Sequence, residues 1–223
     1  LLAVWVEGCA SDRKRESHTD YMTEIGSVGN ASAKLGQQLA TTLTTPALKL
    51  EDLDAELGGY VQTAENQVAR AEEIDAPGAL HPAHQGAVEA LRFRQLGLTG
   101  LKAAFQETAD ASDSAVAGRQ LATQLDRLVA SDIVWADSFA LRASAVLQEE
   151  ELTGIEPPSS EFVTADEITT PEALAAIWQR IQGASDGGTP IGAHGSGISY
   201  VKVLPGGQLL STDTLTEILV TDD

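Results

Sequence analysis

The chain has 223 residues, and its 33 acidic and 14 basic residues give a formal net charge of −19 at pH 7. So acidic a chain is repelled by the phosphates of DNA and RNA, which excludes nucleic acid from the expected partners. Its single cysteine excludes an internal disulfide, and an aromatic content of only 4% favours helices that pack through small and aliphatic side chains.

The first ten residues are predicted to be the end of a membrane anchor and the juxtamembrane stretch that follows it. Residues Leu1–Val6 are almost entirely apolar, and Trp5 lies where an interfacial aromatic residue is expected. This stretch is too short to cross a bilayer, because a membrane helix needs roughly 20 apolar residues, so we expect the anchor to begin upstream of Leu1. The alternative is a frayed strand or helix at the start of a soluble domain.

Cys9 is the lipidation candidate of the sequence. It follows a small residue, Gly8, as the cysteine of a lipoprotein cleavage site does, although Glu7 fits such a site poorly. A plain juxtamembrane cysteine, either palmitoylated or unmodified, is the alternative. The charged residues that follow, Asp12–Glu16, carry both signs, so the positive-inside rule does not orient the chain.

Four amphipathic segments are predicted between residues 11 and 152, because apolar residues recur there at spacings of three and four. Short loops between long helices require antiparallel neighbours, so the expected fold class is mainly α, an up-down antiparallel four-helix bundle. Proline and turn residues separate the segments, and Asp113 or Ser114 is expected to cap the fourth. The segments extend approximately over residues 21–45, 50–74, 82–110 and 114–152.

Three glycines, Gly26, Gly29 and Gly36, lie within the first of these segments. A glycine inside a helix is unfavourable by about 1 kcal/mol relative to alanine. We therefore expect these positions to serve the close approach of a neighbouring helix.

Residues 153–182 differ in pattern from the bundle. Pro157 and Pro158 stand in a stretch without periodicity, which predicts a linker or a loop packed on the bundle. A short helix is expected to start at Pro171, with Thr170 as its cap, and to end by residue 182.

Residues 183–223 are predicted to be a small β-containing C-terminal segment. Glycine and serine are frequent at its start, and two short apolar stretches, Ile198–Leu204 and Leu215–Val220, are predicted to be strands. A last strand needs a partner elsewhere, so a processed or truncated end of this segment is a further hypothesis.

Several short stretches also carry a resemblance to a known group of proteins. The features in their order are Gly8-Cys9 after an apolar segment, Asp12–Arg15, Tyr21, Glu72–Gly78, Leu91–Leu98 and Ala130–Trp135. This order resembles a group of actinobacterial single-pass membrane proteins of unassigned function, over about residues 5–182. The resemblance implies a basic cytoplasmic N-terminus, one membrane helix and an outward-facing helical region. It implies no catalytic residue.

The sequence contains no recognisable motif of catalysis or cofactor binding, so no catalytic, cofactor or metal site is predicted. His81 and His84 flank Pro82 at an expected helix start, where exposed loop histidines are the simpler interpretation and a metal site is the alternative. A di-iron site in a bundle needs Glu-x-x-His motifs and a covalent haem needs Cys-x-x-Cys-His, and the sequence contains neither.

The remaining candidate is an ion pair inside the bundle. Arg92 and Arg94 flank Phe93 in the third segment, and Asp132 lies near the Trp135 face of the fourth. We predict that Arg92 and Asp132 form a partly buried pair, which fixes the register of the helices more than it stabilises them. An anion site inside the bundle is the alternative.

The function expected from these features is that of a scaffold or protein-interaction module of the cell envelope, without catalysis. The expected location is the extracytoplasmic face of the cell membrane, with the N-terminal helix as the membrane contact. The expected partner is another protein or a second copy of the chain. The alternative is a ligand-sensing or solute-binding helical bundle, and an enzyme ranks third.

Overall fold

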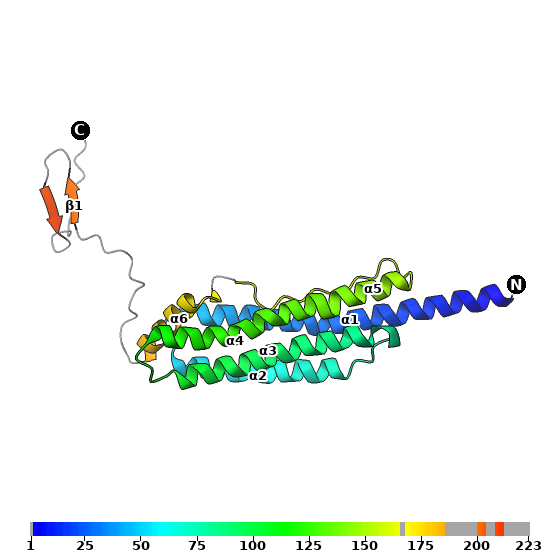
Figure 1. Ribbon diagram of the computed structural model, residues 1–223, viewed down its shortest axis with the longest axis horizontal. Coiled ribbons are helices and arrows are strands. Elements are labelled where there is room, and N and C mark those ends of the chain that lie inside the picture. Colours follow the sequence, from blue (N-terminus) through cyan, green and yellow to red (C-terminus); the bar gives the residue numbers. More distant parts are fainter. Residues whose placement is uncertain (1, 166–167, 186–199, 204–207, 212–223) are drawn as a thin grey trace. The chain divides into compact units, whose positions relative to one another are not determined.

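The computed structural model describes residues 2–165, 168–185, 200–203 and 208–211 of the chain (Figure 1). Side chains are described for residues 12–165 and 168–185. The chain divides into two units, Leu1–Thr189 and Pro190–Asp223. In the described part of the first unit the secondary structure is helical, and the long helices pack antiparallel.

The first three long helices follow the predicted segments closely. Helix α1 spans Leu2–Thr44, α2 spans Leu50–Glu72, and α3 spans His81–Glu107 after a 3-10 turn, η1, at Gly78–Leu80. Proline sits in the first turn of α3, where its missing amide hydrogen would have had no helical partner. The predicted start and end of each helix are therefore confirmed to within a few residues, except that α1 begins much earlier than Tyr21.

The fourth predicted segment is a continuous rod of three parts. Helix α4 spans Ser114–Val134, a π-helical stretch, η2, spans Trp135–Ala140, and α5 spans Leu141–Glu149. The neighbouring helix α3 approaches η2 closely at Gly86, where an added Cβ would lie 2.4 Å from the carbonyl oxygen of Ser138. Only a glycine therefore allows α3 to pack against the widened turn.

The cap of the fourth segment is Asp113, whose carboxylate accepts hydrogen bonds from the amides of Ala115 (2.8 Å) and Val116 (3.4 Å). We expect Asp113→Ala to lower the free energy of unfolding by about 1 kcal/mol, because two amides of the first turn lose their acceptor. Urea denaturation followed by circular dichroism measures this change. Asp110→Ala, at an exposed position in the same loop, is the matched control, and an equal loss in both variants would refute the capping role.

The short helix α6, Pro171–Ser185, packs against α4 and α2. Its predicted cap is confirmed, since the amide of Ala173 donates to the hydroxyl of Thr170 at 3.2 Å. The indole of Trp178 on α6 donates to the hydroxyl of Thr108 at 3.1 Å. This helix is thus part of the helical unit.

The second unit contains a short antiparallel pair of strands. Strand β1 spans Tyr200–Val203 and pairs with β2, Gln208–Ser211, so that Tyr200 lies opposite Ser211. Strand β1 falls inside the predicted stretch Ile198–Leu204. The strand predicted at Leu215–Val220 lies outside the described residues.

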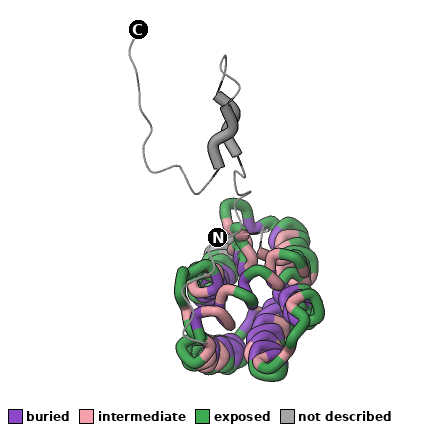
Figure 2. The backbone as a smooth tube through the Cα atoms, turned by 90° about the vertical axis from the view of Figure 1, so that its left-hand side faces the viewer, coloured by how far each residue is buried: buried purple, intermediate pink, exposed green. Residues whose placement is uncertain are grey.

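The buried side chains form two apolar clusters along the bundle, and Figure 2 shows the buried residues facing its interior. One cluster includes Phe162, and the other includes Trp135 and Phe139. Arg94, with only 1% of its surface exposed, lies between them, because its guanidinium carbon is 5.4 Å from the ring centre of Phe162 and 5.5 Å from that of Trp135. A charged residue at this place needs compensating partners.

Candidate functional site

The candidate site is built around an extended segment, residues 153–165, which we call the strap. It follows α5 and lies between α1 and α4. Its side chains alternate, because Ser160 and Phe162 are buried whereas Ser159 and Glu161 are exposed. This period of two is that of a strand, although the surface it contacts is made of helices.

Arg94 on α3 makes four hydrogen bonds inside the bundle. Its Nε donates to the hydroxyl of Ser131 at 3.1 Å, and its Nη1 donates to the hydroxyl of Ser160 at 2.7 Å. Its Nη2 donates to Asp132 Oδ1 at 2.9 Å and to the carbonyl oxygen of Ser160 at 2.8 Å. Burial lowers the pKa of Arg94, and the carboxylate of Asp132 opposes that effect. These contacts supply the partners that a buried guanidinium requires.

Asp132 on α4 joins Arg94 to the backbone of the strap. Its two carboxylate oxygens accept the amides of Phe162 at 2.9 Å and Val163 at 3.0 Å. The Asp132 side chain keeps 20% of its surface exposed, while that of Arg94 keeps 1%. Each ion therefore has hydrogen bonds beyond the pair itself, as a buried ion pair needs if it is not to be destabilising.

The two serine hydroxyls extend this network to the backbone of two helices. Ser131 donates to the carbonyl oxygen of Leu128 at 2.5 Å, and Ser160 donates to that of Gly29 on α1 at 2.7 Å. Helices α1, α3 and α4 and the strap thus meet in one connected polar network within an apolar interior. Chemically, such an arrangement holds and orients a chain segment.

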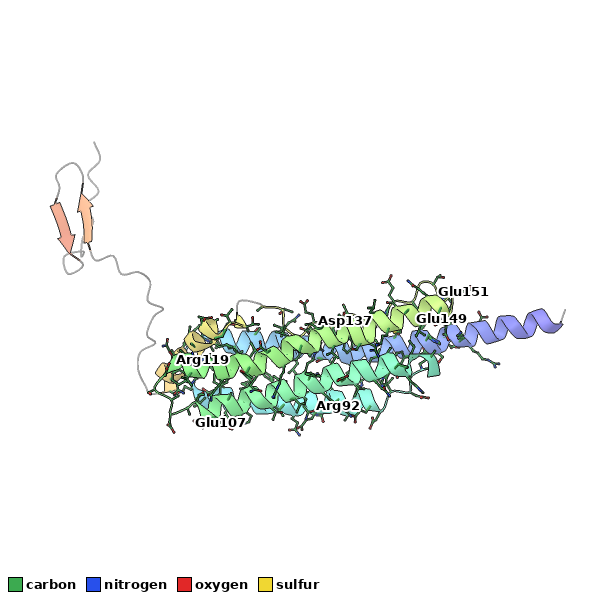
Figure 3. The ribbon with its side chains drawn as sticks, in the orientation of Figure 1. Arg92, Glu107, Arg119, Asp137, Glu149 and Glu151 are labelled. Atoms are coloured by element: carbon green, nitrogen blue, oxygen red, sulfur yellow. The ribbon has the colours of Figure 1, made fainter. Side chains whose placement is uncertain are left out.

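Arg92 lies elsewhere, which corrects the predicted pair of Arg92 and Asp132. Arg92 contacts Glu72 on α2 at the surface, with 58% of its side chain exposed, and Figure 3 places it on the outside of the bundle. The partner of Asp132 is Arg94, because Arg94 lies three residues after Leu91 and four before Leu98 and so shares their buried face.

The glycines of α1 do serve a close approach, as predicted, but a neighbouring helix makes it only at Gly29, and the strap makes it at Gly26 and Gly36. An added Cβ would lie 2.0 Å from the carbonyl oxygen of Phe162 at Gly36, and 3.2 Å from the Pro158 side chain at Gly26. At Gly29 it would lie 2.8 Å from the Trp135 ring. The close approach is therefore made by the strap and one indole ring, which sequence reasoning did not identify as partners.

A second polar cluster ties the beginning of the strap to α1. Arg15 donates to the carbonyl oxygen of Thr153 at 2.8 Å. Glu150, at the end of α5, lies 3.1 Å from the Lys14 ammonium and 2.9 Å from His18 Nε2. The His18 ring is buried, and its Nδ1 lies 2.8 Å from the carbonyl oxygen of Lys14. This cluster fixes the chain reversal between α5 and the strap.

The histidines considered as metal ligands are placed at the start of α3. His84 Nδ1 lies 3.2 Å from the hydroxyl of Tyr21, and the two rings meet edge to face. Among the residues whose side chains are described, no three His, Cys, Asp or Glu side chains gather as a metal site would require. The contact instead joins α3 to α1.

His84 makes the stability of the fold depend on pH. Burial, and next the neighbouring His81, lower the pKa of His84 below 6.5. The unfolded chain therefore binds the proton first, and stability is lost as the pH falls below about 6.5. We expect the free energy of unfolding to fall more between pH 7.5 and 5.5 in the wild type than in His84→Gln. An identical fall in both, measured by urea denaturation at each pH, would contradict this assignment.

The predicted anchor lies at the start of α1. The backbone of residues 2–11 is helical, and Cys9 belongs to this stretch, but its side chain lies outside the described part. Lipidation of Cys9 therefore stays a prediction. Within the part of the chain that the structure describes, no helix combines the length and apolar character needed to cross a bilayer.

Comparisons of the chain with protein-family models, with curated proteins and with solved structures gave no match. The resemblance over about residues 5–182 therefore stays a prediction. What bears on function is the geometry of the helical unit.

Proposed function

We propose that the chain is a membrane-anchored scaffold or protein-interaction module on the extracytoplasmic face of the cell envelope, and that it is not an enzyme. The observation that carries the proposal is the continuity of α1. This helix of 43 residues joins the apolar stretch Leu2–Val6 to the core of the bundle without a break. In Figure 1 its start extends past the ends of the neighbouring helices.

A continuous helix supports this proposal for a mechanical reason. One face of α1 is buried in the core from Tyr21 to Leu43, so the position of the helix is fixed by the bundle. A tether at its start would then hold the whole bundle at a defined distance from the membrane, since each helical residue adds about 1.5 Å. The high negative charge favours solubility of the projecting part.

The membrane tether is tested by fractionation of cells that express the protein from its natural gene. We expect the protein in the membrane fraction, released by detergent and retained in high salt, and cleaved by protease added to intact spheroplasts. A variant of the natural gene whose product begins after Val6 lacks the expected anchor, and it is the control that should be lost from the membrane. Wild-type protein in the soluble fraction would refute the anchor.

The interaction role is tested by affinity purification from mildly solubilised membranes. We expect a stable protein partner or a homo-oligomer at a defined stoichiometry. Recovery of the monomer alone would count against this role.

A second candidate function is the binding of a small ligand, and the observation that favours it is a hollow in the surface of the bundle. The hollow is an open depression of about 620 Å³ between the start of α2 and the end of α3. Asp54, at its wall, accepts hydrogen bonds from Lys102 and Gln106 at 2.6 Å each. A sensing or solute-binding bundle should show a higher melting temperature with its ligand, and Asp54→Ala should abolish that shift. A screen of envelope solutes without any shift would remove this alternative.

A further inference from the structure

The groove between α1 and α4 recognises the strap chiefly through its main chain. The indole of Trp135 donates to the carbonyl oxygen of Pro158 at 2.9 Å, and Arg94 donates to that of Ser160 at 2.8 Å. Asp132 accepts hydrogen bonds from the amides of Phe162 and Val163 at 2.9 and 3.0 Å. Side chains of the helices thus take the place that a neighbouring strand would have in a sheet.

Two side chains of the strap fill specific places in this groove. The hydroxyl of Ser160 lies between Arg94 and the carbonyl oxygen of Gly29. The ring of Phe162 lies against the guanidinium of Arg94, and its carbonyl group occupies the space left by the missing side chain of Gly36. Main-chain contacts that give affinity, combined with pockets for alternate side chains that give specificity, are the general mode by which proteins bind extended peptides.

The hydrogen bonds between the strap and the groove are concentrated in residues 158–163. The start of the strap is bound separately to α1, through Arg15 and the carbonyl oxygen of Thr153. The chain reverses there through two residues with positive φ, Glu151 at 56° and Gly154 at 81°. A non-glycine residue in this conformation costs roughly 1–2 kcal/mol. A surface hollow of about 660 Å³ lies against residues 151–157. Release of residues 158–163 alone would therefore free the groove, and such an opening is a local event.

We propose that this groove is a binding site for an extended segment of a partner protein, and that the strap is its resident occupant. The recognised segment has an apolar residue, a small hydroxyl residue two positions later and an aromatic residue two positions after that, as in Pro158, Ser160 and Phe162. This proposal deepens the interaction role proposed above and rests on it. A partner can enter the groove only while the strap is released from it.

The covalent link gives the strap an advantage over any partner. A tethered segment has an effective concentration on the order of millimolar, so a free segment of equal affinity competes poorly at micromolar concentration. A partner therefore binds well when the strap is weakened or when the partner is itself held at the same membrane. A test in solution must weaken the strap and leave the groove intact.

The test uses the full chain with Ser160→Ala and Phe162→Ala, because both substitutions lie in the strap and none in the groove. A labelled synthetic peptide of residues 155–165 is titrated, and its fluorescence anisotropy is followed. We expect saturable binding to this variant and binding at least about tenfold weaker to the wild-type chain, a difference of about 1.4 kcal/mol. The same peptide with both alanines should also bind at least about tenfold more weakly.

Two results would overturn the proposal. One is a lack of saturable binding to a variant whose circular dichroism shows a folded bundle, and the other is equal binding of the two peptides. Adding Asp132→Asn to the variant is the groove-side control and should weaken the binding, because the peptide amides lose part of their acceptor.

If the double variant does not fold, hydrogen exchange of the wild-type chain decides the question. We then expect the Phe162 and Val163 amides to open at a lower free energy than the amides in the middle of α3, and opening only with global unfolding would overturn the proposal. The interaction role itself is judged separately, by affinity purification of Asp132→Asn from membranes. If this variant retains the partner, the role stands and the groove is not its site.

Discussion

Arg94→Ala is expected to lower the free energy of unfolding by about 3–5 kcal/mol, because removal of one member of a buried ion pair leaves the other without compensation. Ser131, Ser160 and Asp132 each lose a hydrogen bond from the guanidinium. The substitution also leaves a cavity between Trp135 and the strap. Urea denaturation with circular dichroism and Trp fluorescence as separate probes measures the loss.

Arg92→Ala is the matched control, since it removes the same side chain two residues away on the same helix. Its partner Glu72 lies at the surface, where ion pairs contribute little, so we expect a change within about 0.5 kcal/mol. Similar losses in the two variants would show that the buried network has no special role.

Gly36→Ala is expected to destabilise the protein, because insertion of a methyl group into a packed site costs about 1–3 kcal/mol. The new Cβ would lie 2.0 Å from the carbonyl oxygen of Phe162, so α1 or the strap must move. This loss opposes the gain of about 1 kcal/mol that alanine brings over glycine inside a helix. Because the strap is held firmly, we expect a net loss of up to about 2 kcal/mol in the free energy of unfolding.

Gly59→Ala on α2 is the control for helix propensity. A Cβ at Gly59 meets no described side chain or neighbouring element within 4 Å. We therefore expect a gain of about 0.5–1 kcal/mol in the free energy of unfolding. A gain in both variants, measured under the same conditions, would show that the strap yields freely at Gly36.

The helices and their limits could be predicted because their signals are local. Pro46 follows the end of α1, and Asp113 and Thr170 form the caps expected of them. The apolar faces also predicted the core well, since Leu53, Leu57, Ala64, Val68 and Ala71 of α2 are buried. A helix boundary depends on a few neighbouring residues, and these are visible in one sequence.

The contacts of the strap could not be predicted because they join residues far apart in the chain. A loop packed on the bundle was one of the two predicted alternatives for this stretch, and the structure confirms it. The groove that the loop enters was not indicated, since the period of two is brief and includes proline. The sequence did allow Arg94 to be chosen over Arg92, because Arg94 lies on the same helix face as Leu91 and Leu98. The predicted pair with Arg92 did not take this shared face into account.

The π-helical stretch is indicated in the sequence by the spacing of its buried residues. Trp135, Phe139, Ala143 and Leu147 are all buried, and they are spaced by four residues each time. In an ideal α-helix, with about 3.6 residues per turn, such a series drifts around the helix by about 40° at each step. A wider turn corrects part of this drift and keeps all four side chains on the core.

Native-state hydrogen exchange at the amides of Phe162 and Val163 tests most directly the central claim that the buried network fastens the strap between α1 and α4. In the wild type we expect both amides to be protected, because both donate to Asp132. In Asp132→Asn we expect their protection to fall by more than about tenfold, while that of Leu98 in α3 falls less. Unprotected amides in the wild type, or an equal fall at all three sites, would contradict the claim.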